Sequence, residues 1–306
     1  MPAPICIFVF NRPQATLNLL DSLSCNAEAQ HSELYIFSDA ARNEREYPKV
    51  EEVRQIIRNE SRFKTIHIEE APQNKGLVSS IIEGVTSVLQ EYDNVIVLED
   101  DLEVSSNFLT FMNDALHTYK DRSDIWSISG YTPSISIPPD YLDEVFLVPR
   151  AQSWGWATWS DRWHKVNWEV KQFNILKDKH QRALFNQGGN DLYRTLDMQQ
   201  HGKIESWAIR FVFAGFLNHA YTVNPVYSKV RNQAAGSTTN HQGWNDQRHQ
   251  VELSSHPITL NPTIQPNASL ISAFKQHHDL GLISSIGYFM RRHGIGYHFI
   301  KNLFKT

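Results

Sequence analysis

The chain has 306 residues, of which 41% are hydrophobic and 20% are charged, as in an ordinary globular protein. Its formal net charge of −4 argues against a nucleic-acid-binding protein held by bulk positive charge. With only two cysteines it has no disulfide framework, which fits a reducing compartment. No apolar run reaches the roughly 18 residues of a membrane span, and no signal-peptide pattern is visible, so we expect a cytoplasmic protein.

Up to about residue 104, short apolar runs alternate with amphipathic stretches. The runs are rich in β-branched and aromatic residues and predict strands at 5–10, 34–37, 65–68 and 95–98. Apolar residues at helical spacing predict helices at 14–23, 50–58 and 77–89. This alternation predicts an α/β fold with a mostly parallel sheet flanked by helices.

Beyond residue 104 the pattern is mixed. It predicts helices at 107–119, 191–200 and 207–217, and strands at 125–129, 221–223 and 227–230. The segment 241–266 is polar and irregular. The tail from residue 280 is apolar and basic, so it either forms interfacial helices on a membrane or packs on the rest of the chain.

Three consecutive carboxylates, Glu99, Asp100 and Asp101, directly follow the predicted strand 95–98. Ligand crevices of open α/β sheets form at the carboxyl ends of the strands. Carboxylates packed this closely have raised pKa values or need a cation, and their hard oxygens suit Mg²⁺ or Mn²⁺. The segment is therefore either a divalent-cation site or a solvated acidic loop.

Further polar groups occur at the ends of the other early strands. They are, in chain order, Phe10–Asn11–Arg12, Asp39 and Asn74–Lys75–Gly76. The first could receive a phosphate or simply start a helix, and Asp39 could bond a ribose or a base. Because parallel strands end at one edge of a sheet, we expect all of these groups on one rim with the acids. No glycine-rich dinucleotide or P-loop motif is present.

Aromatic residues and one more carboxylate complete the candidate site. Trp154 and Trp156 flank Gly155, where a ligand could approach the backbone and stack on the rings, although core packing is the alternative.

Glu205, just ahead of Trp207, begins a predicted helix. The helix dipole favours a carboxylate there, and a general base is the functional interpretation. The histidines show no zinc-ligand spacing.

The combined motifs resemble bacterial GT-A-type glycosyltransferases, which are similar to the alpha-1,3-mannosyl-glycoprotein N-acetylglucosaminyltransferase I family. The resemblance spans about residues 4 to 241 and rests on segments 10–13, 38–39, 74–77, 97–101, 154–159 and 205–207. It implies a Rossmann-like GT-A sheet and a nucleotide-sugar donor, most simply a UDP-sugar. It also implies a divalent cation, Mn²⁺ or Mg²⁺, on the donor diphosphate, and inversion at the anomeric carbon.

The resemblance also implies roles for individual residues. Asp101 matches the last acid of the family's Glu-Asp-Asp motif, which binds the cation, and Asp39 matches the acid that contacts the nucleoside. Glu205 lies where the family has an acidic pair containing the base, and Ser206 replaces the second member. The remaining residues implied for donor binding are Phe10, Asn11, Arg12, Asn74, Lys75, Gly76, Glu99 and Asp100. Those expected in the acceptor or sugar pocket are Trp154, Gly155, Trp156 and Trp207. The loop 230–241 resembles a donor-binding loop of the bacterial group, except at Gln233 and Ala234.

The resemblance implies an inverting hexosyl- or N-acetylhexosaminyltransferase that acts on a hydroxyl of a glycan or lipid-linked glycan, in bacterial surface polysaccharide synthesis. We expect it in the cytoplasm or on the inner face of the cell membrane. Residues 1–104 would bind the nucleotide sugar, 105–260 would bind the acceptor within the same catalytic domain, and 261–306 would form the tail. The alternatives are a nucleotidyltransferase that makes nucleotide sugars, which the missing triphosphate loop disfavours, and a non-catalytic carbohydrate-binding protein, which needs no acidic rim.

Overall fold

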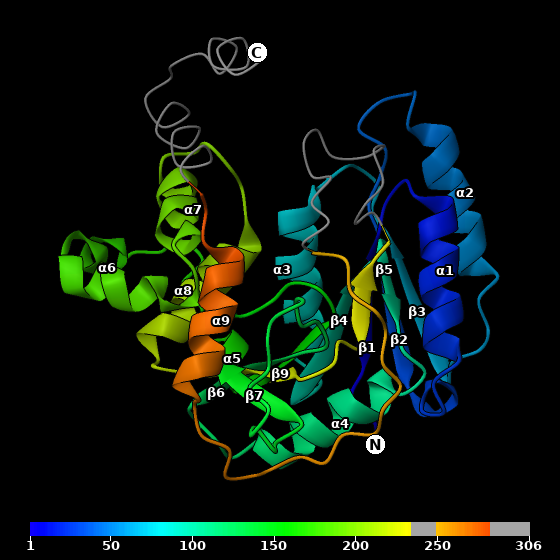
Figure 1. Ribbon diagram of the computed structural model, residues 1–306. Helices are drawn as coiled ribbons and strands as arrows, with labels where there is room; N and C mark the ends of the chain where they lie inside the picture. Colours follow the sequence, from blue (N-terminus) through cyan, green and yellow to red (C-terminus); the bar gives the residue numbers. More distant parts are fainter. Residues whose placement is uncertain (234–248, 282–306) are drawn as a thin grey trace, which may run out of the picture.

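The computed structural model describes residues 1–233 and 249–281, in which an eight-stranded sheet has the order β3-β2-β1-β4-β8-β6-β9-β7 (Figure 1). Its strands are β1 (Ile5–Val9), β2 (Glu33–Ser38), β3 (Thr65–Glu70), β4 (Asn94–Glu99), β6 (Ile125–Ser129), β7 (Val145–Val148), β8 (Trp156–Trp159) and β9 (Tyr221–Pro225). Strands β3, β2, β1 and β4 are mutually parallel, β6 is parallel to β9, and β8 and β7 run antiparallel to their neighbours. A second, two-stranded sheet pairs β5 (Leu102–Val104) with β10 (Val230–Asn232).

Helices flank this sheet. They are α1 (Pro13–Ser24), α2 (Tyr47–Arg58), α3 (Leu77–Val88), α4 (Phe108–Tyr119), α5 (Ser160–Trp163), α6 (Lys179–Phe185), α7 (Asp191–Gln200), α8 (Trp207–Leu217) and α9 (Ala268–His278). Short 3₁₀ segments lie at Ala29–His31, Phe173–Lys177 and Asn186–Gly188. The predicted α/β class with a mostly parallel sheet is confirmed.

Strand β1 shows why the early pattern predicts buried parallel strands. All five of its residues are buried, and successive side chains point to opposite faces of the sheet. Ile7 belongs to the core that contains Leu19 of α1, whereas Phe8 belongs to the core that contains Val85 of α3. Helices α1 and α2 thus cover one face and α3 the other (Figure 1), so β1 and the similarly buried β4 read as continuous apolar runs, whereas the edge strand β3 is largely exposed.

Some elements differ from the sequence-based prediction. Strand β8 lies inside the tryptophan-rich segment and was not predicted, because all four residues are buried and show no alternation. The strand predicted at 227–230 instead begins at Val230. Helix α9 lies within the predicted tail 261–306 and packs on β7, where the rings of Phe274 and Phe146 lie 6.3 Å apart.

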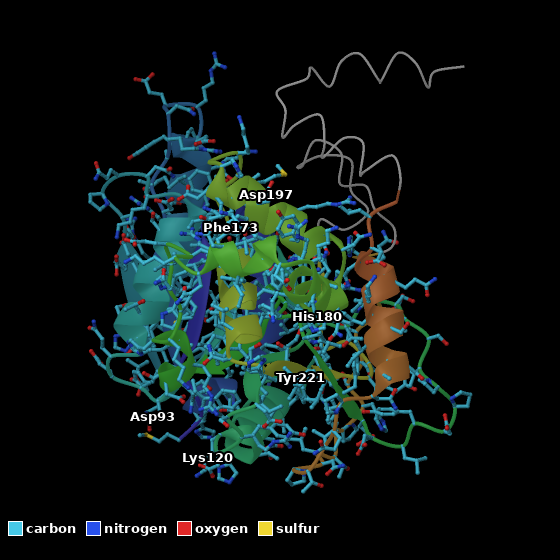
Figure 2. All side chains as sticks on the ribbon, turned by 90° about the vertical axis from the view of Figure 1, so that its left-hand side faces the viewer. Asp93, Lys120, Phe173, His180, Asp197 and Tyr221 are labelled. Atoms are coloured by element: carbon cyan, nitrogen blue, oxygen red, sulfur yellow. The ribbon has the colours of Figure 1, made fainter. Side chains whose placement is uncertain are left out.

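Strands β1 to β4 from residues 1–104 and strands β6 to β9 from residues 105–260 form one continuous sheet, and β5 from the first part pairs with β10 from the second. In the side view of Figure 2, Asp93 and Lys120 lie at the lower end of the molecule, and Asp93 directly precedes β4, so this is the amino end of that strand. The segment expected to form interfacial helices, 283–305, is outside the described residues. Within the described ranges, none of the helices has both the length and the apolar character needed to cross a bilayer.

The acid stability of the fold should depend on His278, the last residue of α9. Its Nδ1 lies 2.9 Å from the carbonyl oxygen of Phe274, and burial, reinforced by Arg150, lowers the pKa of His278 to about 2. The unfolded chain protonates this histidine near pH 6.5 while the folded chain keeps it neutral, so the free energy of unfolding should fall as the pH drops below that value. The loss is at most about 1.4 kcal/mol per pH unit.

Urea unfolding of the wild type and His278→Gln at pH 7.5 and pH 5 measures this effect. The variant should lose less stability than the wild type on acidification. His180→Gln is the control, because His180 is exposed on α6 (Figure 2). If the wild type and His278→Gln lose stability equally, His278 does not govern acid stability.

Candidate functional site

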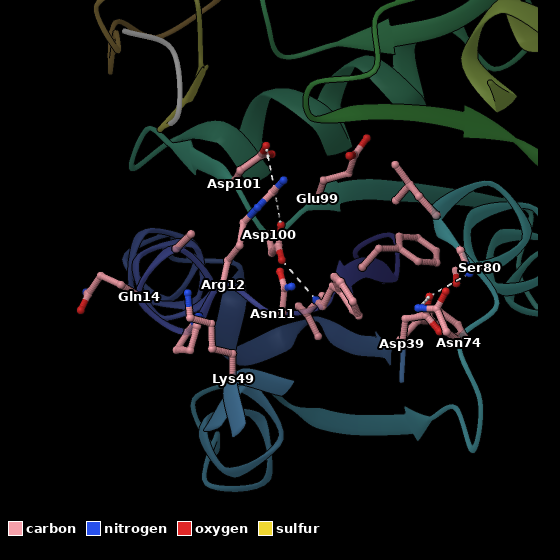
Figure 3. Close-up of a pocket in the computed structure, with 18 of the residues that line it drawn as sticks. Asn11, Arg12, Gln14, Asp39, Lys49, Asn74, Ser80, Glu99, Asp100 and Asp101 are labelled. Atoms are coloured by element: carbon pink, nitrogen blue, oxygen red, sulfur yellow. Dashed lines mark hydrogen bonds and ion pairs between the residues drawn. The ribbon is translucent and has the colours of Figure 1, made fainter. Parts of the chain in front are cut away.

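A cavity of about 930 Å³ opens at the carboxyl ends of β1, β2 and β4 (Figure 3). Strand β1 lies between β2 and β4. The chain leaves β1 through α1 toward β2, and it later returns through α3 to β4, which lies on the other side of β1. In open α/β sheets a crevice forms at this kind of switch point, because the connections diverge there. The cavity is therefore a consequence of the strand order.

Nearly all residues predicted for the donor and the cation line this cavity. They are Phe10, Asn11, Arg12, Asp39, Asn74, Gly76, Glu99, Asp100 and Asp101. The exception is Lys75, which lines a neighbouring cavity of about 130 Å³. Its Nζ lies 3.4 Å from Glu69 and 3.0 Å from Glu83, so its side chain does not serve the larger cavity.

The acidic corner of the cavity consists of Glu99, Asp100 and Asp101. Arg12 Nη1 lies 2.8 Å from Asp100 Oδ1 and 3.0 Å from Asp101 Oδ2. The backbone N–H of Phe10 donates to Asp100 Oδ2 at 3.2 Å. The end of β1 is thus fastened to the end of β4, and one guanidinium nitrogen bridges two carboxylates (Figure 3).

Two carboxyl groups of the acidic corner have raised pKa values. Burial, together with the nearby charges of Asp101 and Asp100, raises the pKa of Glu99 to about 8. Burial also raises the pKa of Asp100 to about 6, although Arg12 opposes that shift. A second cation at this corner would favour ionisation of both carboxyl groups.

The acidic corner fits a divalent cation only if a substrate completes the ligand set. Among the described residues, no group of three or more histidine, cysteine, aspartate or glutamate side chains could hold a metal ion. Asp100 and Asp101 nevertheless share one positive centre, the Arg12 nitrogen, which shows that their oxygens can converge. Mg²⁺ and Mn²⁺ commonly use one or two carboxylates, with phosphate oxygens and water in the other positions.

Asp39 organises the opposite wall of the cavity. Its Oδ1 accepts from the backbone N–H groups of Ala40 and Lys75, both at 2.8 Å, and its Oδ2 accepts from Asn74 Nδ2 and the Gly76 N–H, both at 2.9 Å. Gly76 has φ 76°, a left-handed conformation that suits glycine, and directly precedes α3. Both carboxylate oxygens are engaged, so a direct contact with a nucleoside would compete with these bonds.

Several residues of the cavity were not predicted from the sequence. They include Gln14, Asn18, Arg42, Lys49, Ser80 and Gln233. Arg42 lies over the ring of Phe10, with 5.1 Å between its guanidinium carbon and the ring centroid. Lys49 comes from the first turn of α2 (Figure 3). These residues lie outside the motifs after the early strands, and the packing of α1, α2, α3 and β10 against the sheet brings them to the cavity.

Gln233 fastens the end of β10 to the floor of the cavity. Its backbone N–H donates to the Asp101 carbonyl at 2.7 Å, and its side chain accepts from Asn18 at 2.7 Å and donates to the carbonyls of Ala15 at 3.2 Å and Leu102 at 2.8 Å. This is one of the two positions at which the loop 230–241 departs from the resemblance. The rest of that loop, from residue 234, is outside the described residues.

Most of the predicted sugar pocket belongs instead to the core. Trp156 and Trp207 are 1% and 3% exposed, and their rings stack with centroids 4.9 Å apart, so neither presents a face to a ligand. Gly155 has φ 58°, and a Cβ there would lie 2.6 Å from Val230, so close packing requires the glycine. Trp154 remains half-buried, 4.6 Å from the ring of Tyr131.

Glu205 is not among the described residues that line the cavity. It is exposed and directly precedes Ser206, whose hydroxyl caps α8 by accepting from the Ile209 N–H. Its charge acts on Arg210: burial lowers the pKa of Arg210, and Glu205 opposes that shift. Its role as the base stays a prediction.

Comparison with known proteins gives distant structural similarities. No protein-family model matches the chain, and no curated protein sequence matches it. The first 349 residues of S. aureus TarS align with 76% of this chain and 60% of their own, at 13% identity and a TM-score of 0.42. A structure of GalNAc-T7 with UDP, GalNAc and Mn²⁺ aligns with 76% of this chain and 43% of its own, at 10% identity and a TM-score of 0.46.

A mannosyltransferase from Pyrobaculum calidifontis, in complex with GDP-Man and Mn²⁺, aligns with 52% of this chain and 46% of its own. The identity is 14% and the TM-score 0.35. The chain therefore spans less than two thirds of the length of each of these three structures.

Proposed function

We propose that the protein is a GT-A-type glycosyltransferase that uses a nucleotide-sugar donor, most simply a UDP-sugar. The observation that carries this proposal is the convergence of four separate strand-end segments on one cavity of about 930 Å³. That cavity combines an acidic corner, a guanidinium and polar loop groups, which are the groups needed to hold a diphosphate together with a divalent cation. Residues 1–104 would supply donor binding, and 105–260 would supply acceptor binding.

In this proposal Arg12 and the acidic corner hold the diphosphate end of the donor. Asp39 would act at the nucleoside end of the donor, where it keeps Asn74 and Gly76 in position. A bound Mn²⁺ or Mg²⁺ would supply positive charge that stabilises the leaving nucleoside diphosphate. Asp101 would be its principal protein ligand.

The reaction we propose is inverting transfer to a hydroxyl of a glycan or lipid-linked glycan, as in bacterial surface polysaccharide synthesis. The acceptor oxygen forms a bond to the anomeric carbon from the face opposite the donor phosphate, the bond to that phosphate breaks, and the proton passes to a base. Trp154 is the half-buried aromatic residue of the predicted pocket that remains suited to contact a sugar. The location we propose is the cytoplasm or the inner membrane surface.

Assays of nucleoside diphosphate release from a panel of nucleotide sugars, with Mn²⁺ and a mixture of glycan acceptors, test the function. We expect release from at least one UDP-sugar and formation of a glycosylated product. Formation of pyrophosphate from a nucleoside triphosphate and a sugar phosphate would instead identify a nucleotidyltransferase and contradict the proposal.

Replacing Glu205 by glutamine should retain donor binding yet lower turnover by roughly 10²–10⁴-fold, because the amide cannot accept the acceptor's proton. Steady-state kinetics and a binding titration with UDP measure the two effects. Glu169→Gln is the control, since Glu169 is also exposed and lies outside the cavity lining. Unchanged turnover in Glu205→Gln would assign the base to another residue.

A further inference from the structure

The side chain of Arg12 occupies the carboxylate oxygens that a divalent cation would need as ligands. Its Nη1 lies 2.8 Å from Asp100 Oδ1 and 3.0 Å from Asp101 Oδ2, the two oxygens that converge at the acidic corner. A Mg²⁺ or Mn²⁺ ion bound to Asp101 would lie at about 2.1 Å from its oxygen. Two positive groups that close to one oxygen repel each other strongly at a site this buried. The guanidinium and the divalent cation therefore compete for Asp101 Oδ2.

The backbone of Arg12 is fixed, whereas its side chain has room to move. Pro13 directly follows it as the first residue of α1, and the Arg12 carbonyl accepts from the Thr16 N–H at 2.9 Å. The side chain is 28% exposed and lines the cavity. A change of side-chain rotamer alone can turn the guanidinium from the carboxylates toward the open space.

A diphosphate in the cavity would receive the displaced guanidinium. The planar fork of an arginine side chain matches the oxygens of a phosphate group in two parallel hydrogen bonds. Arg12 would exchange one pair of anionic oxygens for another and would not be left without a counter-charge. A divalent cation that binds alone, by contrast, must displace Arg12 into water.

We propose that Arg12 is an exchangeable counter-ion that holds Asp100 and Asp101 in the free protein and passes to the diphosphate when a divalent cation takes its place. This inference rests on the proposed function. The consequence is that the cation and the nucleotide each raise the affinity of the protein for the other. The diphosphate gives Arg12 a counter-charge when the cation displaces it, and the cation releases Arg12 from the carboxylates so that it can bind the diphosphate. The coupling is reciprocal, as thermodynamic linkage requires.

The test is a Mn²⁺ titration of the full chain, with and without UDP, in the wild type and Arg12→Gln, measured as the electron paramagnetic resonance signal of free Mn²⁺. Without UDP, Arg12→Gln should bind Mn²⁺ about tenfold more tightly than the wild type, because the competing cation is gone. UDP should raise Mn²⁺ affinity in the wild type but at least about fivefold less in the variant. UDP itself should bind the variant more weakly.

Arg42→Gln is the matched control, because it removes one positive charge from the same cavity. Arg42 pairs with Glu46 and lies over Phe10, and it makes no ion pair with the acidic corner. Its Mn²⁺ affinity should change by less than about threefold, since an exposed charge acts only through screened solvent. An equal gain of affinity in Arg42→Gln would show general electrostatics and overturn the exchange.

Removing Arg12 leaves two buried carboxylates without their cation, so the variant is also followed by thermal unfolding. Arg12→Gln should melt lower than the wild type in chelator and recover most of the difference in Mn²⁺. Arg12→Lys, which keeps the charge, should give Mn²⁺ affinity between the two. Equal Mn²⁺ affinity in the wild type, Arg12→Lys and Arg12→Gln would overturn the exchange, even where UDP binds. Absence of UDP binding in all the proteins would instead overturn the proposed UDP-sugar donor.

Discussion

Replacement of Asp101 by asparagine should lower cation-stimulated sugar transfer by roughly 10²–10³-fold, the loss typical when a group that stabilises developing negative charge is removed. Asp101 is 9% exposed, faces the cavity and shares a positive centre with Asp100. The asparagine keeps the shape of the side chain and loses its charge. Initial rates over a Mn²⁺ titration, with a saturating nucleotide sugar, measure the change.

Glu103→Gln is the control for the Asp101 substitution. Glu103 lies two residues further along the chain and pairs with Arg231 at 2.8 Å, outside the cavity lining. Its loss should leave the Mn²⁺ dependence unchanged. Full turnover of Asp101→Asn in the presence of a chelator would show that Asp101 holds no cation during the reaction.

Replacement of Trp156 by alanine should destabilise the fold by about 3–5 kcal/mol, the usual cost of emptying a large buried aromatic site. Its ring lies 4.9 Å from that of Trp207, 5.8 Å from that of Trp163 and 5.2 Å from that of Phe211. Strand β8, which contains Trp156, joins β4 to the rest of the sheet. Urea unfolding followed by circular dichroism measures the loss.

Trp154→Ala separates packing from ligand contact. Because Trp154 is half-buried, its loss should cost less stability than that of Trp156 while weakening acceptor binding more. A Trp156→Ala protein that kept wild-type stability but lost sugar affinity would restore the ligand-stacking interpretation of Trp156.

The sequence carries the parts of the fold that depend on local pattern. Alternating apolar runs and helical spacing predict β1 to β4 with α1 to α3, because each element encodes its own burial pattern. The acids after β4 are predicted to face Asp39 and Arg12 for the same reason, since parallel strands end at one edge. Lys75 shows the limit of that argument, because its backbone joins the wall of the cavity while its side chain turns to Glu69 and Glu83.

Other features depend on contacts between distant segments. From the sequence alone, the tryptophans of β8 could stack on a ligand. In the structure β8 is buried on both faces, and Trp207 of α8 stacks on Trp156. Lys49 and Gln233 reach the cavity only through the packing of α2 and β10. The bridge from Arg12 to Asp100 spans 88 positions in the chain, and no local pattern encodes such a pair.

The most direct test of the account is the melting temperature of the protein with a panel of nucleotide sugars, free nucleotides and free sugars, with and without Mn²⁺. Ligands that bind the native state raise it by mass action. The account predicts a rise of several degrees with at least one nucleoside diphosphate sugar, larger in Mn²⁺ and absent in Asp101→Asn. A protein that responds to free sugars but to no nucleotide, with or without Mn²⁺, would contradict it.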